Sequence, residues 1–152
     1  MAHPTASRLW PLTLLLALVP LLTQAETRYS ERVDDYTIHF NAITTDKLHP
    51  DVARAYDIRR SGNRAVVTVS VLKDVMGAPA EPVPARVTGG WRNLVGHASR
   101  LRMREVKDGA AIYYIDTLSV QDEDTVTFNL NIRPQGAERD YEVDFRRRFY
   151  TE

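Results

Sequence analysis

Six arginines carry the most suggestive chemistry of this sequence, because they fall on outward positions that alternate with apolar residues. They are Arg86, Arg92, Arg102, Arg104, Arg146 and Arg148. A guanidinium group binds carboxylate or phosphate oxygens in bidentate fashion, so arginines gathered on one face would form an anion-binding surface. Neighbouring Glu105, Glu142 and Asp144 can instead neutralise them by pairing across strands. Arginines also protect exposed strand edges by their charge, and the sequence leaves the three interpretations open.

Metal chemistry finds little support in the histidines. Beyond the first 25 residues the histidines are His39, His49 and His97, and no two have the i, i+2 or i, i+4 spacing of ligands on one strand or helix. The chain has no cysteine, and Met76 and Met103 are isolated, whereas small copper carriers usually cluster histidine with methionine. We therefore expect no metal and no other cofactor.

The remaining polar motifs do not indicate catalysis. The acidic run Asp122-Glu123-Asp124 lacks the glycine and the distant bidentate glutamate of a calcium loop, so we expect a solvated turn. No Gly-x-Ser-x-Gly or Ser-x-x-Lys motif marks a nucleophile. No spacing singles out a carboxylate pair for glycoside cleavage. We expect the protein not to be an enzyme.

The elements that must position these residues are β-strands, because apolar and polar residues alternate with a period of two. In Thr125–Arg133 the alternate residues are apolar, and Trp91 belongs by the same parity to a buried face. Residues 111–120 are apolar on both faces, which is typical of a central strand covered on both sides. The predicted strands are 36–42, 65–72, 83–92, 101–104, 111–120, 125–133 and 141–150.

Turn and helix signals separate these strands. Asp108-Gly109 predicts a hairpin, and Gly89-Gly90 inside a strand indicates a bulge or a close backbone approach. Proline at the first position predicts one short helix at 50–56, with Val52, Ala55 and Tyr56 on its apolar face. About seven strands with regular turns predict an all-β, immunoglobulin-like antiparallel sandwich, with a small barrel as the alternative.

Residues 1–25 have the three parts of a cleavable signal peptide. Arg8 supplies the positive charge, Leu12 to Leu22 form an apolar core, and Thr23-Gln24-Ala25 has the small-x-small pattern of a cleavage site. The apolar core is shorter than the roughly 20 residues of a membrane-spanning helix. We predict cleavage between Ala25 and Glu26, which leaves one sandwich domain at 26–152 without a membrane span.

The charge balance excludes a typical nucleic-acid-binding protein. The full chain has 20 basic and 20 acidic residues, and removal of Arg8 leaves the mature chain with a net charge near −1. Nucleic-acid binders usually carry a basic excess. The absence of cysteine also excludes disulfides and a lipoprotein anchor.

Four segments resemble the family of small exported Gram-negative proteins named domain of unknown function 4426. They are AYDIRRSGNRAVVTVSVLK (55–73), TGGWRNLVGH (88–97), REVKDGAAIYYIDTLSV (104–120) and FRRRFY (145–150). The resemblance covers most of residues 27–150. It implies a periplasmic location, a single domain and no established activity, and it supplies no functional residues.

We therefore expect a non-catalytic periplasmic module that binds an envelope protein or peptide through strand edges or loops. The alternative is a carrier or sensor of a small anionic ligand that uses the arginine-rich face. A second alternative is a small hydrolase, which would need a histidine and an acid in contact within a cleft.

Overall fold

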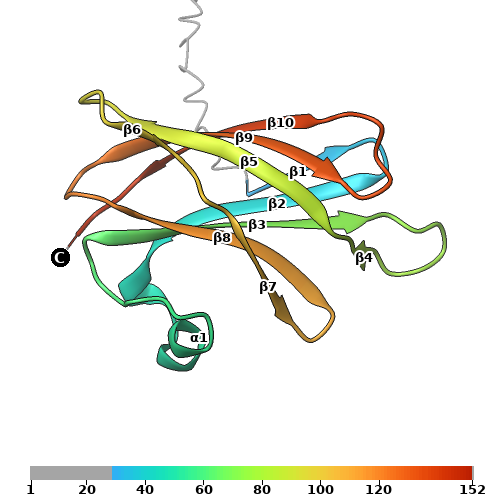
Figure 1. The fold of residues 1–152 in the computed structure, drawn as a ribbon, viewed down its shortest axis with the longest axis horizontal. Coiled ribbons are helices and arrows are strands. Elements are labelled where there is room, and N and C mark those ends of the chain that lie inside the picture. The colour runs from blue at the N-terminus through green and yellow to red at the C-terminus, as the bar shows by residue number, and fades with distance from the viewer. Residues whose placement is uncertain (1–28, 152) are drawn as a thin grey trace, which may run out of the picture.

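Two antiparallel sheets form the protein, and the computed structural model describes residues 29–151. Sheet A holds, in spatial order, β1 (Ser30–Val33), β2 (Tyr36–Thr44), β3 (Arg64–Lys73), β8 (Ala111–Ser119) and β7 (Arg104–Asp108), with β4 (Glu81–Pro82) beside β3. Sheet B holds β10 (Tyr141–Arg148), β9 (Thr125–Pro134), β5 (Ala85–Asn93) and β6 (Ala98–Arg100). Figure 1 shows the two sheets as stacked layers.

The strand order confirms the predicted immunoglobulin-like sandwich. The order β2-β3-β8-β7 matches the A-B-E-D sheet of that fold, and β10-β9-β5 matches its G-F-C sheet. β6 adds an edge strand to sheet B, while β1 and β4 extend sheet A. The predicted signal peptide at 1–25 and its cleavage site between Ala25 and Glu26 lie outside the described residues.

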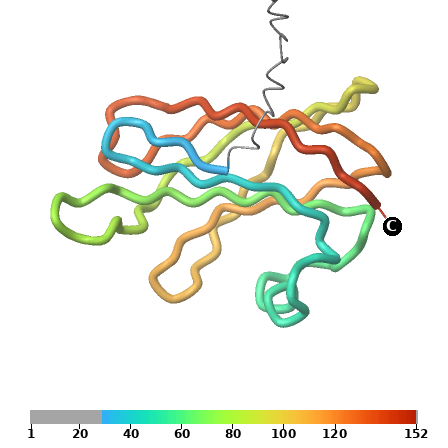
Figure 2. The backbone as a smooth tube through the Cα atoms, turned by 180° about the vertical axis from the view of Figure 1, so that it is seen from behind, coloured from blue at the N-terminus to red at the C-terminus, as the bar shows by residue number. Residues whose placement is uncertain are grey.

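Period-two alternation places one row of each strand in the core between the sheets. On β9 the residues Val126, Phe128, Leu130 and Ile132 are buried, while Asn129 and Asn131 between them are exposed. The ring of Phe145 stacks on Phe128 at 4.7 Å between centroids and lies 5.0 Å from the ring of Phe40 in sheet A. Figure 2 shows the backbones of β10 and β2 running beside each other. The contact between Phe145 and Phe40 joins the two sheets along this pair of strands.

The far face of sheet A has a second, smaller core beneath a helical segment. The 3-10 turn η1 (Thr45–Lys47) and helix α1 (Pro50–Ala55) follow β2, and Ala53 and Ile58 pack against Val66 and Ile115. The predicted helix at 50–56 is therefore confirmed, and Tyr56 of its predicted apolar face packs against this core, but the prediction is wrong for Val52 and Ala55. Ala53 is buried, whereas Val52 and Ala55 are exposed. The helix is therefore rotated about its own axis relative to the prediction, so that Ala53 faces the sheet. β8 is covered on both faces, as predicted.

Three short strands and one crossover differ from the predicted strands. β1, β4 and β6 are too short to show a periodic pattern, and the sequence did not predict them. The predicted strand at 101–104 is wrong: residues 101–103 carry the chain from sheet B to sheet A, with Leu101 buried in the core. The predicted strand at 83–92 corresponds to β5, which begins at Ala85 in sheet B, while β4 just before it pairs with β3 in sheet A.

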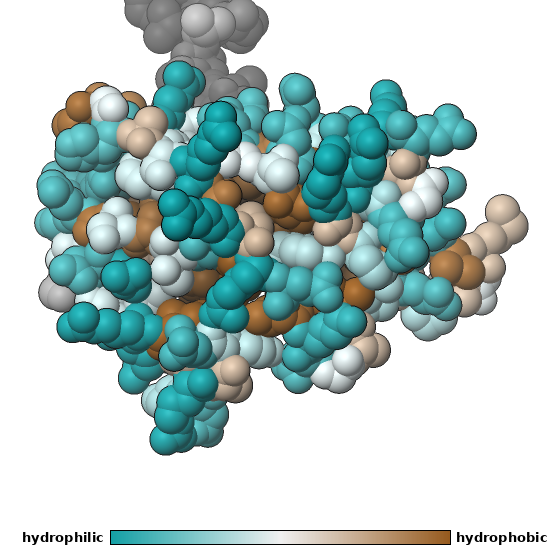
Figure 3. Space-filling model, in the orientation of Figure 1, coloured by the Kyte–Doolittle hydropathy of each residue, from teal (hydrophilic) through white to brown (hydrophobic). Residues whose placement is uncertain are grey.

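Polar residues cover most of the outer surface. Figure 3 shows hydrophilic side chains over one face, with apolar residues visible in strips between them. The exposed large apolar residues include Met76, Leu94 and Val95, which lie in loops. Among the described residues, no helix is long and apolar enough to span a bilayer.

Gly89 lies in β5 close against the backbone of β9. A Cβ atom at this position would lie 2.2 Å from the carbonyl oxygen of Asn129 in β9. The Gly89 carbonyl also accepts a hydrogen bond of 3.0 Å from the amide of Leu101, which fixes the start of the crossover. This confirms the close backbone approach predicted from the glycine pair.

We predict that Gly89→Ala lowers the free energy of unfolding by about 2–3 kcal/mol, since the added methyl group must displace the β9 backbone. Gly109→Ala is the matched control, because its Cβ would meet no atom within 4 Å and its φ of +58° alone is unfavourable, at about 1 kcal/mol. Denaturant unfolding of both variants measures the difference. Equal losses would show that the strands separate there at little cost.

Candidate functional site

The structure divides the six predicted arginines between the two sheets. Arg86, Arg92, Arg146 and Arg148 lie on the outer face of sheet B, where Arg92 and Arg146 flank Thr127 in one row across β5, β9 and β10. Arg102 lies on the crossover and Arg104 on β7 in sheet A. The six do not form one face.

Acidic neighbours compensate part of this set, although they are not the acids proposed from sequence. Arg86 lies 3.6 Å from Asp140, which also binds Arg133, and Arg148 lies 3.0 Å from Glu123. Glu105, by contrast, accepts a hydrogen bond from the Tyr114 hydroxyl, and Asp144 accepts one from Asn129. Arg92 and Arg146 form no ion pair with a described residue.

Arg102 and Arg104 have structural contacts of their own. The backbone amide of Arg102 donates a 2.7 Å hydrogen bond to the carboxylate of Asp116, and the Arg104 guanidinium donates to the carbonyl of Tyr56. The second contact joins β7 to the segment that follows α1. Both arginines therefore help to hold the crossover and the helix against sheet A.

An inward-facing arginine, Arg147, is the cationic residue that sequence reasoning missed. It lies opposite the buried Val126 in the register of β9 and β10, so it continues the inner row that contains Phe145. Its guanidinium donates a 2.7 Å hydrogen bond to the Tyr29 hydroxyl and lies 5.5 Å from the centre of that ring. The signal was present in the sequence, because Arg147 occupies the apolar parity of its strand.

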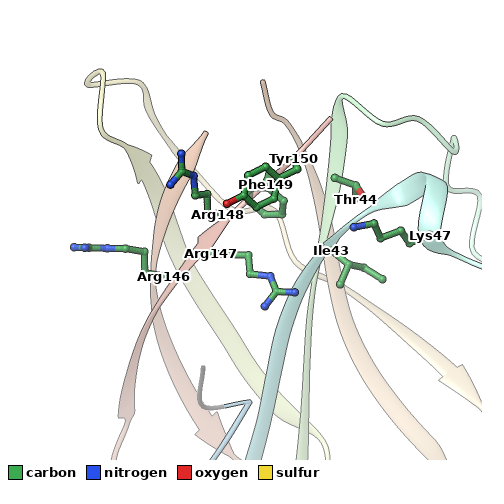
Figure 4. Close-up of a pocket in the computed structure, with 8 residues that line it drawn as sticks. All are labelled: Ile43, Thr44, Lys47, Arg146, Arg147, Arg148, Phe149 and Tyr150. Carbon is green, nitrogen blue, oxygen red and sulfur yellow. The ribbon is translucent and has the colours of Figure 1, made fainter. Parts of the chain in front are cut away.

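Arg147 borders a groove of about 360 Å³ between the C-terminal ends of β2 and β10, which we call the basic groove (Figure 4). Figure 4 shows the side chains of Lys47 and Arg147 extending into the space between the two strands, while Arg146 points away from it. Ile43, Phe149 and Tyr150 supply apolar surface. The lining residues are Ile43, Thr44, Lys47, Arg146, Arg147, Arg148, Phe149 and Tyr150.

A second groove, of about 220 Å³, lies on the outer face of sheet A, and we call it the apolar groove. It runs between the α1 segment and the hairpin of β7 and β8, and its lining is mostly aliphatic and aromatic. Val52 at its rim is 41% exposed. Burial and the nearby Asp108 carboxylate raise the pKa of Tyr56, which also lines it. The lining residues are Leu48, Val52, Tyr56, Ile58, Val66, Thr68, Val106, Asp108, Tyr113 and Ile115.

A polar network closes the opposite end of the sandwich. The Asp34 carboxylate accepts hydrogen bonds from the Tyr141 hydroxyl at 2.6 Å and from the Arg139 guanidinium at 2.9 Å. The hydrogen bond from Tyr141, followed by that from Arg139, lowers the pKa of Asp34 below its ordinary value of 3.8. Asp34 is separated by more than 100 residues from both partners, so no local pattern predicts the network.

The histidines are dispersed in the structure. His39 is exposed on β2, His49 accepts a hydrogen bond from the amide of Asp51 at the start of α1, and His97 lies in the loop before β6. Among residues 29–151, no group of three or more His, Cys, Asp or Glu side chains is arranged to hold a metal ion.

The acidic turn joins β8 to β9 and is tied to the C-terminal segment. The Asp122 carboxylate accepts from the amide of Thr151, and the carbonyl of Asp124 accepts from the amide of Phe149. Glu123 pairs with Arg148. The three residues therefore hold the end of the chain beside the basic groove.

Fold and surfaces together define a small immunoglobulin-like β-sandwich module that carries the basic groove and the apolar groove. The model of DUF4426, a domain of unknown function, matches residues 30–152, and the chain belongs to this family. A crystal structure of a DUF4426 family protein from Pseudomonas aeruginosa PAO1 shares 26% sequence identity at a TM-score of 0.69, covering 85% of this chain and 99% of that one.

A second solved structure shows the same fold in another protein. The copper-reconstituted P19 protein from Campylobacter jejuni has a TM-score of 0.52 at 12% identity, covering 79% of this chain and 92% of that one. At this identity the likeness extends to the fold alone. No curated protein matches the chain at a significant level.

We predict that the Asp34 carboxyl titrates below 3.8, and that Tyr141→Phe moves its midpoint up toward that value by removing the stronger hydrogen bond. Carbon-13 NMR of the carboxyl group measures both midpoints. Because the folded pKa is lowered, the network stabilises the fold above the unfolded pKa, and this contribution is lost as the pH falls through the folded pKa. A midpoint unchanged by Tyr141→Phe would contradict the assignment, and Tyr150→Phe serves as the control.

Proposed function

We propose that the protein is an exported, non-catalytic module of the periplasm that binds a protein or peptide, taking up an extended segment alongside β7. The observation that carries the proposal is the position of β7, which ends sheet A and borders the apolar groove. An added strand gains affinity from main-chain hydrogen bonds and specificity from pockets for alternate side chains.

β7 has the features that strand addition requires. It pairs with β8 along its whole length and with no other described strand, so its second edge offers main-chain donors and acceptors. Val106 in its centre lines the apolar groove, where a partner side chain would bury aliphatic surface. The other four residues of β7 carry charges that alternate in sign along the strand, and the Lys107 ammonium lies 3.5 Å from the Glu105 carboxylate. Such charges select the register and discourage unspecific edge pairing.

The surroundings of the histidines support a role without catalysis. None of them lines either groove. His49 lies 3.6 Å from Asp51, but both side chains are about seven-tenths exposed at the start of a one-turn-and-a-half helix. A general base needs a positioned substrate beside it, which an open helix start does not provide.

We predict that a photo-crosslinking amino acid at Lys107 captures a defined periplasmic partner in the native host, because this side chain lies on the open edge strand. Val52→Asp should abolish the crosslink, since it places a charge at the rim of the apolar groove at a position that is already 41% exposed and so leaves the core intact. Mass spectrometry of the crosslinked complex identifies the captured partner. It also determines the N-terminus of the protein that carries the crosslinker, which we expect at Glu26.

The matched control carries the crosslinker at Arg86, on the outer face of sheet B. Capture from Arg86 equal to that from Lys107, or a Lys107 crosslink that persists in Val52→Asp, would contradict binding at β7. Recovery of the protein in the cytoplasm with its N-terminus at Met1 would contradict export.

A further inference from the structure

We infer that the basic groove binds a phosphate group, free or esterified, through Arg147, Lys47 and the hydroxyl of Thr44. This site lies between β2 of sheet A and β10 of sheet B. β7 lies at the edge of sheet A, separated from β2 by β3 and β8, so the site is independent of strand addition. It also differs from the outward arginine face expected from the sequence, because its central arginine points into the sandwich.

The charge of the groove is the first argument. Lys47, Arg146, Arg147 and Arg148 line it, and no acidic residue among the described part of the chain does so. Arg148 is neutralised by Glu123 at 3.0 Å, and Arg146 points outward. Two positive charges, those of Lys47 and Arg147, therefore face the groove without an acidic partner in it.

The position of Arg147 is the second argument. On an inner row of a sandwich an apolar residue would extend the core, as Phe145 and Phe149 do on either side. Within residues 29–151, Arg147 instead donates its side-chain hydrogen bond to a neutral phenol, that of Tyr29, at 2.7 Å, and forms no ion pair. A guanidinium group has five donors, so most of them stay available to an incoming ligand.

The hydroxyl of Thr44 is the third, independent argument. Thr44 lines the groove from the inner face of sheet A, is 2% exposed, and its Oγ1 atom has no hydrogen-bond partner within residues 29–151. A buried hydroxyl without a partner destabilises the fold, whereas valine would fill the same space without that cost. Rotation of the Thr44 side chain to another staggered rotamer would turn this hydroxyl toward the groove, where a ligand oxygen would supply the missing partner.

The chemistry of these groups selects phosphate over a single carboxylate. A phosphate monoester carries about −1.5 to −2 charge at neutral pH, which matches two uncompensated cations, and its three oxygens can serve the guanidinium, the ammonium and the hydroxyl together. Ile43, Phe149 and Tyr150 offer apolar surface for the body of an ester.

The test is a titration of amide NMR spectra of the protein at neutral pH and low salt with three probes: inorganic phosphate, phenyl phosphate and benzoate. We expect saturable shifts at Thr44, Lys47 and Arg147 with the phosphates, and binding of benzoate at least about tenfold weaker than that of phenyl phosphate, since it carries one charge. Tighter binding of phenyl phosphate than of inorganic phosphate indicates an ester as ligand, and equal binding indicates free phosphate.

Arg147→Gln and Lys47→Gln should each weaken phosphate binding at least about tenfold. Lys47 is exposed, so its variant keeps the fold even if Arg147→Gln does not. Arg86→Gln and Lys73→Gln are the matched controls, because they remove the same charges away from the groove and should leave binding unchanged. Thr44→Val should raise the melting temperature while weakening phosphate binding about threefold or more.

Three results would overturn the inference. The first is no saturable shift with either phosphate. The second is an affinity that Lys47→Gln lowers no more than Lys73→Gln does, since that shows unspecific attraction. The third is benzoate binding as tightly as phenyl phosphate. An unchanged affinity in Thr44→Val would remove the hydroxyl from the site.

Discussion

The contact between the two inner faces of the sandwich is the constraint on which the other features depend. Phe145 stacks on Phe128 within sheet B and meets Phe40 across the interface, so three rings join β2, β9 and β10. Burial of each ring contributes roughly 2–3 kcal/mol to the free energy of unfolding. Because these rings fix the distance and register between β2 and β10, they also determine what lies at either end of that pair of strands.

The two ends of this strand pair are polar, and they differ in a way that matters for function. At one end Tyr36 lies beside Tyr141, and Asp34 accepts hydrogen bonds from Tyr141 and Arg139, so the charges are matched within the protein. At the other end the inner rows finish with Thr44 and Arg147, and the groove between them has cations without acids. The charges at one end of the sandwich are therefore paired within the protein, whereas the cations at the other end are available to bind an external anion.

Much of the fold was predictable because a period of two is a direct consequence of one buried face. The rows of β2, β3, β9 and β10 follow the predicted parity, and the hairpin of β7 and β8 turns where Asp108-Gly109 indicated. Short strands escaped prediction, since β4 and β6 contain two and three residues and show no period. The crossover at 101–103 has strand-like alternation because Leu101 and Met103 both pack against the core between the sheets while the chain passes from sheet B to sheet A.

The surfaces were less predictable, since they depend on which strands become neighbours. The six arginines share an outward pattern but lie on both sheets and the crossover, which only the strand order decides. The partners of Arg86 and Arg148 are Asp140 and Glu123, which lie in turns rather than opposite them on strands. Arg147 could have been found from parity alone, whereas the apolar groove depends on how α1 packs on sheet A.

Native-state hydrogen exchange tests most directly whether one shared core holds both sheets. The account predicts that amides at the centre of β3, such as Val69, and of β9, such as Leu130, exchange with the same free energy of opening, equal to that of global unfolding. Exchange from one sheet at a clearly lower free energy would show that the sheets open separately. It would contradict the claim that their inner faces form a single cooperative unit.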